Sequence, residues 1–184
     1  MLRWTARRQV TGPITSVNNP LVKEVAQLRR TRRRRETGLI LIEGPQLAAE
    51  ALAAGVTIDV GFTTEPAVHP DAIEVSGAVL ARLSTTVTPN SLVIVADRPS
   101  RSPGDGRDLA VLWDVAEPGN VGALIRSAAA FGFDVVVAGQ GAADPWSPKA
   151  LRAGAGGHFH TAIRIASALT VEDLHHLGFT TVAT

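Results

Sequence analysis

Residues 113–139 read WDVAEPGNVGALIRSAAAFGFDVVVAG, and their pattern sets the architecture of the C-terminal half. Both ends are short apolar runs typical of buried strands, and the middle has the 3.6-residue periodicity of an amphipathic helix. The apolar face of that helix consists of Val121, Leu124, Ile125, Ala128 and Ala129. A strand, a helix and a second strand in this order predict a parallel unit.

The turn before this helix invites a nucleotide-binding interpretation, which its details exclude. Only Gly119 and Gly122 are present, so the G-x-G-x-x-G pattern is missing, and no Walker lysine follows. Asn120 is well placed to cap the helix, and Gly132 to end it. Arg126 falls off the apolar face and is predicted to point away from the core.

The rest of the C-terminal half repeats this alternation. We expect strands at 109–115, 134–139 and 161–166, helices at 121–131, 147–154 and 170–178, and the start of a further strand at 179–184. This order predicts a parallel sheet with both faces covered.

The N-terminal half predicts a smaller α/β unit. Asn19 and Pro20 open a helix that the arginines at 29–35 extend or follow as a turn. We expect strands at 38–43, 57–63, 72–75 and 91–97, and helices at 45–55 and 76–84. Residues 97–108 are rich in Pro, Gly, Ser and charge, which favours a flexible linker. The predicted division is therefore 1–96, a linker at 97–108, and 109–184.

Charge is distributed unevenly along the chain. Residues 1–36 hold ten Lys and Arg against two acids, whereas the rest hold eight against fifteen. Such asymmetry indicates a polyanionic partner for one end. The arginine run is either a solvated helix face or a set of phosphate contacts, and the mutual repulsion of its charges favours phosphate contacts. The basic candidates are Lys23, Arg29, Arg30, Arg32, Arg33, Arg34 and Arg35.

A third informative stretch covers residues 144–163. Lys149 and Arg152 lie three residues apart on one predicted helical turn, which makes them further RNA-binding candidates. Gly154, Gly156 and Gly157 allow a close approach of the backbone to another segment. His158 and His160 alternate on an extended stretch, which favours a surface location over a metal site because no third ligand is in view.

Composition excludes several classes of protein. Cysteine is absent, which excludes disulfides, thiol catalysis and thiolate metal sites, and we expect a cytoplasmic protein without a metal. No run approaches about 18 consecutive apolar residues, so no membrane span is expected.

Several of these stretches together resemble one family. Residues 14–52 are similar to the substrate-binding domain of SpoU (TrmH-like) RNA ribose 2′-O-methyltransferases, which has a basic helix followed by a strand ending in Glu-Gly, here Glu43 and Gly44. Residues 112–139 resemble the family motif D-x-x-x-P-x-N-x-G-x-x-x-R-x-A, and residues 147–163 resemble P-K-x-x-R-x-S-x-G-x-x-F. Among these enzymes the chain most resembles actinobacterial large-subunit rRNA methyltransferases of the thiostrepton-resistance type.

The resemblance implies a fold, an activity and roles for residues. The fold is an N-terminal α/β RNA-binding domain followed by the first part of a SPOUT (α/β knot) methyltransferase domain. The activity is S-adenosylmethionine-dependent 2′-O-methylation of RNA, with large-subunit rRNA as the partner and a homodimer as the full-length assembly. Arg126 matches the arginine that activates or positions the ribose hydroxyl, and Asn120 matches the residue that helps to place it.

Two departures from the family matter. Gly154 stands where the family has serine. The family's last segments, G-N-E-x-x-G and S-L-N-V-S, which form the knot and hold the cofactor, do not occur in residues 1–184. We therefore expect no cofactor-binding residue in this chain, and neither cofactor binding nor methyl transfer by the chain alone. An RNA-binding protein without methyl transfer is the alternative.

Overall fold

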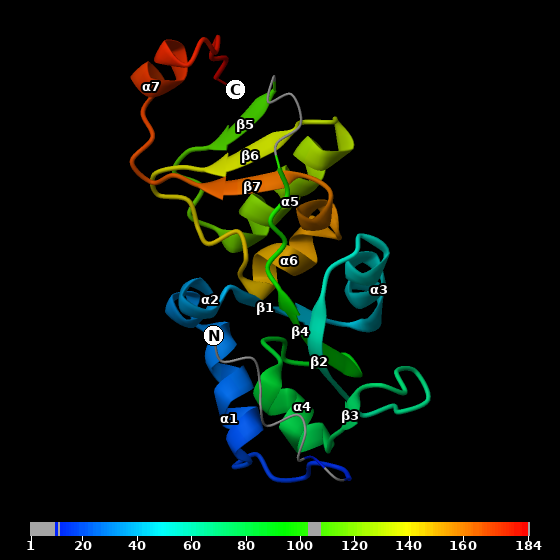
Figure 1. The fold of residues 1–184 in the computed structure, drawn as a ribbon. Helices are drawn as coiled ribbons and strands as arrows, with labels where there is room; N and C mark the ends of the chain where they lie inside the picture. Colours follow the sequence, from blue (N-terminus) through cyan, green and yellow to red (C-terminus); the bar gives the residue numbers. More distant parts are fainter. Residues whose placement is uncertain (1–9, 11, 103–107, 184) are drawn as a thin grey trace.

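The computed structural model describes residues 10, 12–102 and 108–183. Figure 1 shows two sheets, one in each half of the chain, with helices between them and around them. No strand is shared between the two sheets among the described residues. The α/β class expected from the sequence is confirmed.

The N-terminal sheet has four strands in the order β1-β4-β2-β3, with β1 at Leu39–Glu43, β2 at Ile58–Thr63, β3 at Ile73–Glu74 and β4 at Leu92–Asp97. β4 runs antiparallel to both of its neighbours, while β2 and β3 are parallel. All four predicted strands of this half are therefore present, within one or two residues of their expected ends.

Both faces of this sheet are buried, and β1 shows how. Leu39 and Leu41 pack in a cluster with α1 and α4, whereas Ile40 and Ile42 pack in a second cluster that includes side chains of the C-terminal half. Because alternate residues of a strand face opposite sides, a continuous apolar run is required here.

The helices of this half are short. They are α1 (Pro20–Ala26), a 3-10 turn η2 (Gln27–Arg29), α2 (Thr31–Thr37), α3 (Pro45–Ala53) and α4 (Gly77–Leu83). Asn19 caps α1 as predicted, since its side chain accepts a hydrogen bond from the Leu21 amide. Arg30 has extended dihedral angles, so the arginine run starts a separate helix instead of continuing α1.

The C-terminal sheet has three parallel strands in the order β5-β6-β7, formed by Leu109–Leu112, Val135–Ala138 and Ala162–Ile165. Its helices are α5 (Pro118–Ala130), α6 (Pro148–Gly154), a 3-10 turn η3 (Gly157–Phe159) and α7 (Val171–His176). The predicted parallel alternation is confirmed. Residues 179–183, expected to begin another strand, are not in a strand.

The stretch from β5 to α5 differs in detail from the prediction. β5 ends at Leu112 instead of 115, because Asp114 adopts a left-handed conformation with φ 54° that ends the extended chain. Glu117, not Asn120, caps α5, and Pro118 takes its first position. Leu124 is 43% exposed, so it lies outside the buried face formed by Val121, Ile125 and Ala128.

The two halves share a hydrophobic core. Helices α5 and α6 lie between the two sheets (Figure 1). Trp146, Leu151 and Phe159 of the C-terminal half pack with side chains of β1, α3 and β4 in one buried cluster. Of the predicted flexible linker at 97–108, residues 103–107 lie outside the described part of the chain. Its described part is held in place, because Asp97 ends β4 and Arg101 Nε donates to the Phe159 carbonyl at 2.6 Å. No described helix has the length and apolarity needed to cross a membrane.

Candidate active site and RNA interface

Arg126 projects from the exposed side of α5. The opposite side of the helix carries Val121 and Ile125, which are fully buried against the C-terminal sheet and α6. Asn120 is exposed at the third position of α5 and does not cap the helix. The sequence therefore placed Arg126 on the correct side of the helix, but it assigned the wrong residue to the cap.

Two glycines allow other backbone segments to approach α5. A Cβ atom on Gly122 would lie 2.8 Å from the Cβ atom of Ala153 and would overlap the Ala150 carbonyl, so the contact between α5 and α6 requires glycine at this point. A Cβ atom on Gly157 would lie 2.9 Å from the Cα atom of Arg126. The backbone that carries the candidate catalytic arginine is therefore seated against η3.

The close approaches predicted for residues 154–157 are confirmed. A side chain on Gly154 would overlap the imidazole of His158, and a Cβ atom on Gly156 would lie 3.3 Å from the Cβ atom of Glu50 in α3. Together with Gly157, these residues place the η3 turn between α5 and the N-terminal half. The glycine at 154, where the family has serine, leaves the space that the His158 ring occupies.

Most of the arginine run faces solvent. Five of the predicted RNA contacts are exposed side chains on α1, η2 and α2, which we call the basic set: Lys23, Arg29, Arg30, Arg32 and Arg35. Arg32 donates to Glu36 at 2.7 Å, and this contact raises the pKa of Arg32 and lowers that of Glu36. Arg33 is half-buried and lies 3.4 Å from Glu24. The basic set is free to meet phosphates, since an exposed ion pair exchanges partners at little cost.

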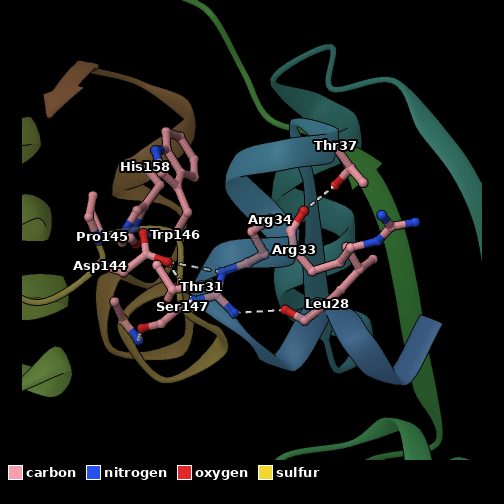
Figure 2. Close-up of polar contacts among 11 residues, drawn as sticks. Leu28, Thr31, Arg33, Arg34, Thr37, Asp144, Pro145, Trp146, Ser147 and His158 are labelled. Atoms are coloured by element: carbon pink, nitrogen blue, oxygen red, sulfur yellow. Dashed lines mark hydrogen bonds and ion pairs between the residues drawn. The ribbon is translucent and has the colours of Figure 1, made fainter. Parts of the chain in front are cut away.

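Arg34 was wrongly included among the RNA contacts. Its side chain is 3% exposed and points into the molecule, away from Arg33 (Figure 2). Its Nε and Nη2 atoms donate to Asp144 Oδ2 at 3.1 and 2.5 Å, and its Nη1 atom donates to the Leu28 carbonyl at 2.7 Å. A guanidinium that is buried and bonded in this way cannot reach a phosphate.

Arg152 also has a structural partner. Its Nη1 atom lies 3.2 Å from Glu43 Oε2 and donates to Thr85 Oγ1 at 2.8 Å, so it joins α6 to the N-terminal half. Glu43 is 2% exposed in its side chain and also accepts hydrogen bonds from Ser84 and Thr85. Arg152 and Glu43 both stand in sequence motifs, but the sequence does not indicate that they pair.

Lys149 remains an exposed cation beside the start of α5. Its Nζ atom lies 2.6 Å from Glu117 Oε1, and both side chains are more than half exposed. The hydrogen bonds from Lys149 and from the Gly119 amide lower the pKa of Glu117. Glu117 therefore stays ionised while it caps α5, where a negative charge is favourable.

His158 is buried instead of lying on the surface as expected, whereas His160 is exposed. The His158 Nε2 atom lies 2.9 Å from the Pro145 carbonyl and must donate to it, and burial lowers the pKa of the imidazole to about 4. His158 is therefore neutral near pH 7. Within the described ranges, no group of three or more His, Asp or Glu residues is arranged to hold a metal ion.

Comparison with known proteins is consistent with this arrangement. Residues 109–184 match the SpoU rRNA Methylase family, and residues 19–94 match the MRM3-like substrate binding domain. An uncharacterised tRNA/rRNA methyltransferase of Synechocystis is 37% identical over 78% of this chain and 58% of its own length. The 23S rRNA (guanosine(2553)-2′-O)-methyltransferase RlmP of Bacillus subtilis is 32% identical over 82% of this chain and 63% of its own length.

Solved structures show the same fold. An AdoMet-bound rRNA methyltransferase from Sinorhizobium meliloti superposes with a TM-score of 0.75 at 26% identity, covering 90% of this chain and 67% of that chain. The combination of an α/β substrate-binding unit and a parallel sheet is shared with RNA methyltransferases of known structure. An RNA 2′-O ribose methyltransferase of known structure is 31% identical, with a TM-score of 0.71, over 90% of this chain and 69% of that chain. Together with the two family matches, this similarity shows that the chain belongs to the SpoU rRNA methylase family. It spans less than two thirds of the length of the two curated relatives described above.

Proposed function

We propose that this chain is the RNA-recognising part and the first catalytic part of an S-adenosylmethionine-dependent ribose 2′-O-methyltransferase that acts on large-subunit rRNA. The observation that carries the proposal is the exposed Arg126 on a helix whose backbone is held by η3 and α6. The names of the relatives, which include a 23S rRNA 2′-O-methyltransferase, support the choice of RNA and of the ribose hydroxyl.

Arg126 suits the chemistry that the ribose requires. A ribose hydroxyl is a weak nucleophile near neutral pH, so its attack is helped by a fixed cation that stabilises developing negative charge. A guanidinium can contact the hydroxyl oxygen and the adjacent phosphate together because its donors lie in one plane. Because the helix backbone is held in place, the Arg126 side chain can also orient the hydroxyl for attack.

The cofactor would supply the electrophilic methyl group. The carboxyl ends of β5, β6 and β7 meet at one edge of a parallel sheet, which is where such sheets bind ligands. At this edge the described residues form strand ends and glycine turns, with Gly139 beside Leu112 and Gly141 beside Asp114. We do not expect these residues alone to enclose the cofactor. We propose that sequence present in the longer relatives completes this site, so we assign no cofactor contact to residues 1–184.

The N-terminal half supplies affinity for RNA. The basic set presents five cations on consecutive short elements, and Lys149 adds one beside α5. We also propose the division at 97–108, a cytoplasmic location, and a homodimer in the complete protein. The exposed Leu124 of α5 and the exposed Phe131, which directly follows the helix, support self-association.

The test is to map the product. The complete gene product is incubated with S-adenosylmethionine and large-subunit rRNA, and ribose methylation is located by mass spectrometry of RNA fragments. One methylated ribose at a defined site is expected. RNA binding without incorporation would favour the alternative, an RNA-binding protein without methyl transfer.

A further inference from the structure

Arg34 differs from every other member of the arginine run because it faces the seam between the two halves. Besides Asp144 and the Leu28 carbonyl, its Nη2 atom donates to Thr31 Oγ1 at 3.0 Å. Figure 2 shows the guanidinium directed from α2 toward the turn at 144–147. The side chain of Asp144 is 7% exposed, so both charges are withdrawn from water.

Asp144 holds the turn that leads into α6. Its Oδ1 atom accepts from the Trp146 amide at 3.0 Å, while its Oδ2 atom accepts from Arg34. The intervening Pro145 carbonyl accepts from His158 Nε2, and the rings of Trp146 and His158 lie 5.7 Å apart. A series of direct contacts therefore links Arg34 through this turn to His158 of η3.

The last contact reaches Arg126. Gly157 precedes His158 and is seated against the Arg126 backbone, at a distance that leaves no room for a side chain. Gly156, at the start of the same η3 turn, lies against Glu50 of α3. The η3 turn is therefore in close contact with α3 on one side and with the segment of α5 that carries Arg126 on the other.

We infer that Arg34 is a positioning residue for Arg126, acting through Asp144, the Pro145 carbonyl and η3. The inference rests on the proposed function, because it concerns the arginine assigned to methyl transfer. One short helix then has two roles: its exposed arginines contact RNA, and its buried arginine sets the geometry of the reaction.

A gain in folding stability does not by itself explain why Arg34 and Asp144 form a buried ion pair. The cost of desolvating two charges is large, and apolar residues of similar volume often replace buried ion pairs without loss of stability. The directed hydrogen bonds, in contrast, fix the turn in a way that apolar contacts do not. The test therefore has to separate geometry from folding.

The test variant is Arg34→Met/Asp144→Leu in the complete gene product, which leaves no unpaired buried charge. We expect kcat at saturating RNA to fall at least about tenfold, equivalent to about 1.4 kcal/mol, with the KM for RNA changed less than about twofold. Arg35→Gln, from the basic set, should show the opposite profile, a raised KM with a smaller change in kcat. Gln27→Ala, an exposed neighbour, should change neither. Asp144→Asn, which keeps an oxygen acceptor for the Trp146 amide but puts an NH2 donor where Oδ2 accepts from Arg34, replaces the double variant if that one fails to fold.

Hydrogen exchange on the complete gene product gives a second readout that needs neither cofactor nor RNA. Exchange should accelerate in peptides covering α5 and η3 and stay unchanged in α1 and α4. Unchanged kcat together with unchanged exchange in α5 would overturn the inference. If the unmodified protein methylates no RNA, the proposed function fails, whereas the exchange result still decides whether Arg34 positions α5.

Discussion

Arg152 of α6 and Glu43 of β1 form an ion pair at 3.2 Å that joins the C-terminal half to the N-terminal half. Thr85 contacts both residues, which closes a small network at the seam. Both residues stand in motifs that resemble those of the family. The structure therefore gives these motif positions a role in the assembly of the two halves.

Removing Arg152 should destabilise the chain. Arg152→Ala leaves the buried Glu43 carboxylate with only neutral donors, and we expect a loss of about 2 kcal/mol in the free energy of unfolding, less than for a fully buried pair because Arg152 is 28% exposed. Urea denaturation measures it. Lys149→Ala, which breaks an exposed pair, is the control and should cost at most about 1 kcal/mol. Equal losses in the two variants would contradict the structural role of Arg152.

His158 should make the chain sensitive to mild acid. Its pKa is lowered to about 4 in the folded state, so the unfolded state takes up a proton first as the pH falls below the ordinary value of 6.5. The free energy of unfolding should therefore drop by about 2 kcal/mol between pH 7 and pH 5. His158→Gln retains a donor for the Pro145 carbonyl but does not titrate. Denaturation curves at both pH values should show a smaller drop in this variant, and an identical drop would exclude His158 as the cause.

Gly122→Ala should separate α5 from α6. The new methyl group would overlap the Ala150 carbonyl, which is backbone and cannot rotate away. We expect a loss of about 1–3 kcal/mol, measured as a lowered midpoint of thermal unfolding. Gly119→Ala lies three residues earlier in the same helix, where the nearest atom to a Cβ is 3.4 Å away, and should be tolerated. Equal midpoints of thermal unfolding in the two variants would show that α5 and α6 are not in close contact at Gly122.

The basic set should determine the salt dependence of RNA binding. Replacing Arg29, Arg30, Arg32 and Arg35 with glutamine should lower the magnitude of the slope of log K against log salt by up to about 3, because each phosphate contact releases counterions. Affinity measured by filter binding at several salt concentrations gives the slope. Arg34 is left in place because it is buried. An unchanged slope would show that RNA phosphates do not contact these four arginines.

Much of the fold followed from periodicity. The alternation of Leu39–Glu43 with flanking helices, and the strand–helix–strand pattern around α5, were strong local signals. The ends of helices and strands were less predictable. The left-handed conformation of Asp114 has no clear signal in the sequence, and Glu117 caps α5 in place of Asn120.

The site was predictable only in part. Arg126 could be placed on the exposed side of its helix from spacing alone, and the glycines at 154–157 correctly signalled close approach. Arg34 could not be told apart from its neighbours, since six arginines in one run look alike and its partner Asp144 lies 110 residues away. Such long-range pairs depend on how the two halves dock, which local patterns do not encode.

The proposed function depends above all on the participation of Arg126 in methyl transfer. The most direct measurement is single-turnover methylation of large-subunit rRNA by the complete gene product carrying Arg126→Ala, with Ser127→Ala on the neighbouring exposed position as the control. The proposed role requires a loss of at least about a hundredfold in rate, or about 2.7 kcal/mol, with RNA affinity within about twofold and full activity in the control. A near-normal rate in Arg126→Ala would remove Arg126 from the mechanism.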